Sequence, residues 1–79
     1  MVTVHRQSGL RFAIHTDDHE PPHVHVLGDG EMKVVISGAG GLPELIGAEG
    51  MKQGDIRRAM RIATEQQDYF MECWREIHD

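Results

Sequence analysis

The sequence predicts a single α+β domain in which a small antiparallel sheet of about four strands packs against one long C-terminal helix. Residues 1–36 alternate between apolar and polar side chains in short runs separated by turn signals, the pattern of an antiparallel β-meander. From position 53 to about 78, apolar residues recur every three or four positions, which is the period of a helix. A chain of 79 residues has room for one domain, covering residues 1–79.

Each predicted strand begins or ends at a turn signal. Ser8-Gly9 separates the first two strands, and Gly28-Asp29-Gly30 forms a hairpin turn between the last two. Alternation places three sets of apolar side chains on the inner face: Leu10, Phe12 and Ile14; Val24 and Val26; Met32, Val34 and Ile36. The four predicted strands span residues 2–5, 10–15, 23–27 and 31–36.

Residues 37–50 hold five of the nine glycines and are expected to form a connector with at most one short strand. Phosphate binding by this segment is not expected, because the Gly-Lys-Ser/Thr ending of a phosphate loop is missing. The helical segment then covers residues 51–79. Gln67 is the polar member of its apolar stripe, so one continuous helix is preferred and a break into two helices stays open.

The densest chemistry lies between Asp17 and Val26, which contain three histidines, three carboxylates and two prolines. Proline fixes φ and pushes the preceding residue out of the helical region, so the chain must turn or extend at Pro21 and Pro22. Alternation after the prolines puts His23 and His25 on the face opposite the core. An antiparallel pairing of the second and third strands would bring His15 to the same outer face.

Three roles are open for His15, His23 and His25. With His19 or a loop carboxylate, they could bind a zinc or iron ion, although two histidines two positions apart are only a moderate signal. They could instead contact a protein partner, or serve as hydrogen-bonded packing held by the prolines. The same cluster could respond to pH, because free histidine titrates near neutrality. No other cofactor is indicated.

The segment Glu20-Pro21-Pro22-His23-Val24-His25-Val26, with its upstream strand and charged C-terminal helix, resembles a family of small uncharacterised prokaryotic proteins known as domain of unknown function 4160. The resemblance implies a compact α/β domain without a settled activity. It also implies work with another small protein in toxin–antitoxin-like or mobile-element settings. It supplies no catalytic residue to transfer to this chain.

The charge, the cysteine content and the hydropathy of the chain indicate which kinds of partner and which location to expect. Eight Lys+Arg against 13 Asp+Glu give a net charge of −5, which argues against broad binding to a phosphate backbone and favours a basic protein partner. The single cysteine, Cys73, excludes an intrachain disulfide, and no export signal or membrane span is recognisable, so a cytoplasmic location is expected. A monomer or small homo-oligomer fits this size.

The helical segment carries two charged surfaces. Arg57, Arg58 and Arg61 form a basic edge, which is either solvated or a docking site for an acidic partner or nucleic acid. Acidic residues then recur every three or four positions, with Tyr69 beside them, and predict a surface that binds a basic partner. This acidic ridge comprises Glu65, Asp68, Glu72, Glu76 and Asp79.

A catalytic nucleophile is poorly supported, because Cys73 lies beside the apolar stripe and Ser8 and Ser37 lie in glycine turns without a nucleophile-elbow motif. No catalytic residue is assigned. The sequence therefore predicts a non-enzymatic protein-binding module that regulates or inhibits a larger partner. It could be a phage-borne, anti-CRISPR-like inhibitor of a nucleic-acid-binding surface, or a toxin–antitoxin component. The alternative is a metal-dependent hydrolase or nuclease that uses His15, His23 and His25; direct nucleic-acid binding comes third.

Overall fold

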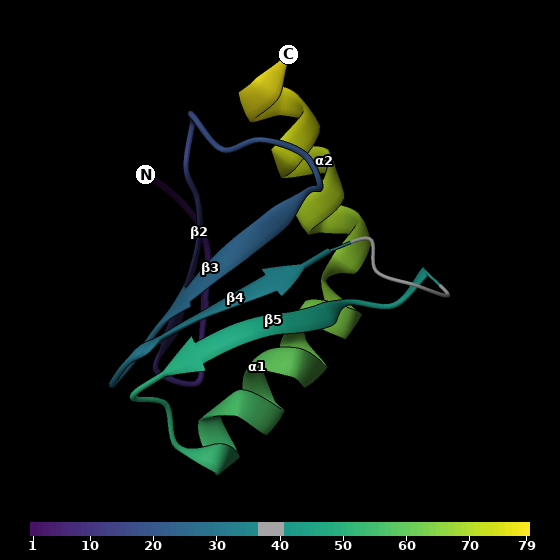
Figure 1. Ribbon diagram of the computed structural model, residues 1–79. Coiled ribbons are helices and arrows are strands. Elements are labelled where there is room, and N and C mark those ends of the chain that lie inside the picture. Colours follow the sequence, from purple (N-terminus) through teal and green to yellow (C-terminus); the bar gives the residue numbers. More distant parts are fainter. Residues whose placement is uncertain (37–40) are drawn as a thin grey trace.

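The computed structural model describes residues 1–36 and 41–79 and has an α+β fold. Its strands form one antiparallel sheet in the order β1-β2-β3-β4-β5, and both helices lie on the same face of this sheet (Figure 1). The predicted fold class is confirmed, whereas the numbers of strands and helices differ from the prediction. The strands are β1 (Val2–Gln7), β2 (Leu10–Ile14), β3 (His23–Leu27), β4 (Glu31–Val35) and β5 (Glu44–Glu49).

The fifth strand, β5, lies within the segment predicted as a connector. It pairs with β4 from Val35↔Glu44 to Glu31↔Glu49, with a one-residue bulge at Ile46. Every residue of β5 is exposed, so the strand lacks the alternation of buried and exposed side chains by which sequence patterns reveal strands. Ser37 to Gly40, the first part of the predicted connector, lie outside the described residues.

The preference for one continuous helix is wrong, because the helical segment divides into α1 (Gln53–Glu65) and α2 (Gln67–His78). Gln66 between them leaves helical geometry, with φ −103° and ψ 15°. The next residue, Gln67, turns its amide toward the sheet and donates hydrogen bonds to the carbonyl oxygens of Ile36 and Gly41, at 2.7 and 2.6 Å. A polar residue within an apolar stripe needs such partners, and the break supplies them.

The core lies between the inner face of the sheet and the two helices. All eight inner-face side chains predicted from the alternation are buried, from Leu10 on β2 to Ile36 after β4. The helices contribute Ala59, Ile62, Ala63, Phe70 and Trp74, and the ring of Phe70 stacks on Phe12 with centroids 5.4 Å apart. Neither described helix is long and apolar enough to cross a membrane.

Candidate functional site

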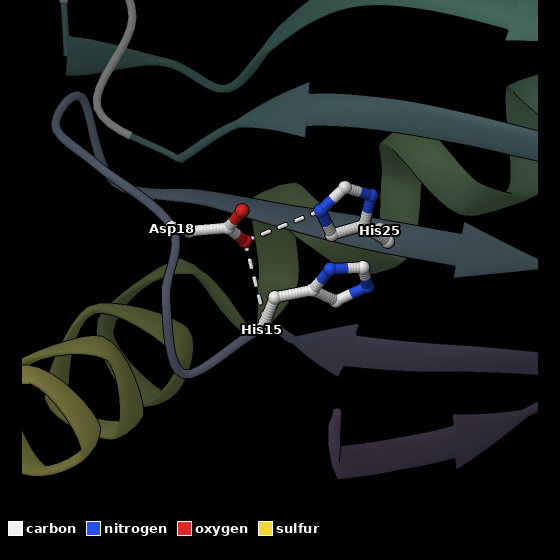
Figure 2. Close-up of side chains that lie close together, drawn as sticks. All are labelled: His15, Asp18 and His25. Carbon is white, nitrogen blue, oxygen red and sulfur yellow. Dashed lines mark hydrogen bonds and ion pairs between the residues drawn. The ribbon is translucent and has the colours of Figure 1, made fainter.

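The three candidate metal histidines gather on the outer face of the sheet. His15 follows the last residue of β2, and His25 pairs with Ala13 across the two strands, so the rings of His15 and His25 stack with centroids 4.1 Å apart (Figure 2). The ring of His23 lies edge-on to His25 at 5.2 Å. The prediction that these residues share one face is therefore confirmed.

Although these histidines lie on the outer face of the sheet, their side chains are largely covered by other parts of the chain. His23 and His25 are 4% and 9% exposed, and His15 is partly buried. The ring of Trp74, from α2, lies 5.2 Å from that of His23, and the loop that carries Asp18 runs beside His15 and His25 (Figure 2). This burial is compatible with the structural, hydrogen-bonded role considered for the histidines; contact of His23 and His25 with a partner stays a prediction.

Asp18 connects the three histidines. Its Oδ2 accepts a hydrogen bond from Nε2 of His25 at 3.2 Å and one from the backbone N–H of His15 at 3.3 Å, and it lies 3.1 Å from Nε2 of His23. Burial raises the pKa of Asp18, but the nearby His23 and the hydrogen bonds from His25 and His15 outweigh this effect, so its pKa lies below the ordinary value. Asp18 is thus held in the charged form.

The sequence could not single out Asp18. Asp17, Asp18 and Glu20 stand in the same predicted loop, and only the fold of that loop decides which carboxylate meets the rings. The loop is fixed by a hydrogen bond from the backbone N–H of Asp18 to the carbonyl oxygen of His15, 3.2 Å long, and by a cis peptide bond between Glu20 and Pro21. His19, the other loop histidine considered as a ligand, is exposed.

A cleft of about 420 Å³ opens beside Asp18 and His23. Loop residues form one wall, and the outer faces of β4 and β5 form the other, which contributes Lys33, Val35 and Ile46. The histidine cluster is therefore buried but lies next to accessible space.

The predicted partner-contacting residues of the helices lie apart from this cluster. Arg57, Arg58 and Arg61 are exposed on α1, where Arg58 forms an ion pair with Asp55. The acidic ridge is exposed along its whole length, and Tyr69 beside it donates a hydrogen bond to the carbonyl oxygen of Val4, at 2.9 Å. No ion pair was found for the ridge within residues 1–36 and 41–79.

A further surface was not foreseen from the sequence. Leu42, Leu45 and Ile46 are 61%, 38% and 55% exposed. Leu45 pairs with Val34 of the core face and Ile46 lines the cleft on the outer face, so exposed apolar side chains lie on both faces of the β5 edge. Alternation could not reveal this surface, because the segment reads as a glycine-rich connector.

Comparison with known proteins adds one finding. Residues 9–75 match the family model described as "Domain of unknown function (DUF4160)". No curated protein and no solved structure shows significant similarity.

Proposed function

Because the chain belongs to the DUF4160 family, whose description names no activity, we propose from its surfaces that it is a small non-enzymatic module that binds another protein. The observation that supports this function is the β5 edge, where an exposed strand carries exposed apolar side chains. Natural edge strands are usually blunted, because unpaired backbone groups and apolar side chains together invite another chain to pair. Leu45 and Ile46 on β5, together with Leu42 ahead of the strand, supply the apolar component of such a contact.

The charges around β5 favour a basic partner over a second copy of the chain. Glu44 and Glu49 stand at the two ends of the strand, and Glu31 lies opposite Glu49 on β4. An antiparallel pairing of β5 with a second copy, over its full length, would place Glu44 of one chain opposite Glu49 of the other. Like charges directly opposite each other are destabilising in a sheet, whereas a strand flanked by Lys or Arg would be attracted.

The acidic ridge supports the same choice of partner. Its side chains are exposed, and the net charge of −5 makes the molecule as a whole attractive to a basic surface. A protein that covers a basic, nucleic-acid-binding surface acts as an inhibitor of it. We therefore propose that the protein acts in the cytoplasm as a regulator or inhibitor, either as a phage-borne inhibitor or as a toxin–antitoxin component.

The test is affinity capture of a partner from the native host with three forms of the protein. Ile46→Lys places a charge on the β5 edge. Gln53→Lys is the control, because it adds the same charge at the exposed first residue of α1, outside β5 and the acidic ridge. We expect the wild type and Gln53→Lys to retain one partner in a fixed stoichiometry. Ile46→Lys should weaken binding of the purified partner at least about tenfold, as a loss of about 1.4 kcal/mol.

Further measurements on the purified complex separate the two surfaces. Affinity should fall as salt rises, because salt screens exposed charges. If reversal of Glu65, Asp68 and Glu72 to lysine abolishes binding while Ile46→Lys leaves it unchanged, the partner binds the acidic ridge and not β5. If no partner is retained by any form, the protein-binding function is wrong.

A further inference from the structure

The atoms of the histidine cluster have the spacing of a metal-binding site. One ligand atom from each of His15, Asp18 and His25 lies within 4.8 Å of the others. Ligand atoms bound to one tetrahedral zinc ion, at about 2.0–2.1 Å from the metal, lie about 3.4 Å apart. The three groups therefore need to approach each other by at most about 1.4 Å, which side-chain rotations can supply.

His23 lies outside this group of three, but it approaches the same carboxylate and can supply a fourth ligand. Its Nε2 lies 3.1 Å from Oδ2 of Asp18, and Nε2 of His25 lies 3.2 Å from the same oxygen. Both distances are close to the separation of about 3.4 Å expected for two ligands of one zinc ion. The carboxylate oxygen of Asp18 therefore already lies at nearly the distance from these two imidazole nitrogens that it would have if all three bound the same zinc ion.

The hydrogen bonding of His23 shows which of its nitrogens is free. Nδ1 of His23 lies 2.8 Å from the carbonyl oxygen of Pro21, which can only accept, so Nδ1 carries the proton. In the neutral ring, Nε2 then presents a lone pair. This nitrogen has no hydrogen-bond partner among the described residues, and its side chain is 5% exposed. A buried lone pair 3.1 Å from a carboxylate oxygen requires a positive charge between them, either a proton or a metal ion.

The surroundings favour the metal ion. Histidines that bind metals almost always donate their second N–H to a backbone carbonyl or a carboxylate, which fixes the ring. His23 has this arrangement with Pro21. Nδ1 of His25 lies 3.6 Å from Oε2 of Glu31, which is too far for a hydrogen bond, and it has no hydrogen-bond partner among the described residues. If Zn²⁺ replaced the proton that Nε2 of His25 donates to Asp18, the proton of the neutral ring would lie on Nδ1 and face Glu31. A protonated His23 would use the same contact between Nδ1 and Pro21, so it is the approach of His15 and His25 to the same carboxylate that points to a metal ion.

We propose that His15, Asp18, His23 and His25 bind one divalent zinc ion, which fixes the loop of residues 16–22 to the outer face of the sheet. Imidazole nitrogens with one carboxylate oxygen are donors that suit zinc. Four protein ligands fill a tetrahedral coordination sphere, so the site is structural. Its occupation does not depend on the binding of a protein partner.

The experiment uses untagged protein treated with a chelator and then titrated with Zn²⁺ by calorimetry. We expect one Zn²⁺ bound per chain and a melting temperature that rises with the Zn²⁺ concentration, since an ion that binds the folded state stabilises it. Co²⁺ in place of Zn²⁺ should give the visible absorption of a tetrahedral site. In nitrogen NMR of the imidazole rings, Zn²⁺ should shift Nε2 of His23 and His25.

Two variants locate the site. Asp18→Asn keeps the shape of the side chain but removes its charge, and should weaken Zn²⁺ binding more than about 100-fold, beyond the usual loss for an outer-contact residue. His19→Gln is the matched control, because it removes an exposed histidine of the same loop and should leave affinity unchanged. If Asp18→Asn does not fold, the NMR and Co²⁺ measurements on the wild type still test the proposal. Absence of stoichiometric binding, or equal affinity in Asp18→Asn and His19→Gln, would overturn the proposal and assign a proton to His23.

Discussion

A single side chain, that of Gln67, joins three segments that are far apart in sequence. From the start of α2 its amide nitrogen donates to the carbonyl oxygen of Ile36, directly after β4, and to that of Gly41, ahead of β5. Both acceptors are backbone groups, which cost free energy when they are left without a partner. Gln67 therefore fixes the position of α2 relative to the end of β4.

We expect Gln67→Ala to lower the free energy of unfolding by about 1 kcal/mol, because the part-buried carbonyl group of Ile36 loses its donor, whereas the exposed carbonyl group of Gly41 can bind water instead. Urea denaturation followed by circular dichroism measures this change. Gln66→Ala is the control, with an expected effect within about 0.5 kcal/mol, since no side-chain hydrogen bond of Gln66 was found in the described part of the chain. Equal effects in the two variants would show that the Gln67 bonds contribute no net stability.

At the scale of elements, two glycines near the start of α1 differ in whether their backbone conformation tolerates a side chain. Gly54 lies in the first turn of α1, and a Cβ there would meet nothing closer than the flexible Arg58 side chain, at 3.8 Å. Gly50, directly after β5, has φ +69°, a conformation that side chains with a Cβ rarely adopt. The same substitution should therefore act in opposite directions at the two positions.

Gly54→Ala should raise the free energy of unfolding by up to about 1 kcal/mol, because alanine loses less backbone entropy in a helix. Gly50→Ala should lower it by about 1 kcal/mol or more, because the left-handed conformation strains a residue with a Cβ. Thermal and urea unfolding of both variants provide the measurement. A gain in stability at Gly50 would contradict the positive φ there.

At the scale of the whole molecule, burial decreases from the middle of the sheet toward β5. β3 is covered on both faces: Val24 and Val26 face the core, and His23 and His25 lie beneath the Asp18 loop. β5 is exposed at every residue. Local opening should therefore cost less at β5 than at β3.

Native-state hydrogen exchange followed by NMR should show amides of β5 exchanging more than about tenfold faster than the paired amides of β3. Dilute protein at two concentrations provides the control for self-association. Protection of β5 equal to that of β3, and rising with concentration, would mean that a second copy covers this edge, contrary to the charge argument from Glu44 and Glu49.

The parts of the fold that could be predicted from the sequence are those in which burial of one face produces a regular pattern of apolar residues. Leu10, Phe12 and Ile14 alternate because one face of β2 is buried, and the stripe that includes Phe70 and Trp74 reflects helices packed on the sheet. β5 has no such apolar pattern, because all of its residues are exposed and its backbone pairing requires no particular side chains. The helix break was visible only as the polar Gln67, whose acceptors are 31 and 26 residues away along the chain.

The candidate site was predicted in part for the same reason. Strand alternation placed His15, His23 and His25 on one face, but the choice of Asp18 depends on the path of the loop, which alternation does not describe. Likewise, the burial of His23 depends on Trp74, which approaches from a helix about 50 residues later.

The two outer strands of the sheet differ in how accessible their free edges are. On β1 the register shifts between Thr3 and His5, and the carbonyl oxygen of Val4 at this irregularity accepts the hydroxyl of Tyr69. Polymerisation by strand exchange between molecules requires each molecule to offer two usable edges. Because the carbonyl oxygen of Val4 is already used in this way, we expect β1 to accept another strand less readily than β5, so that assembly through β5 gives pairs and not fibres.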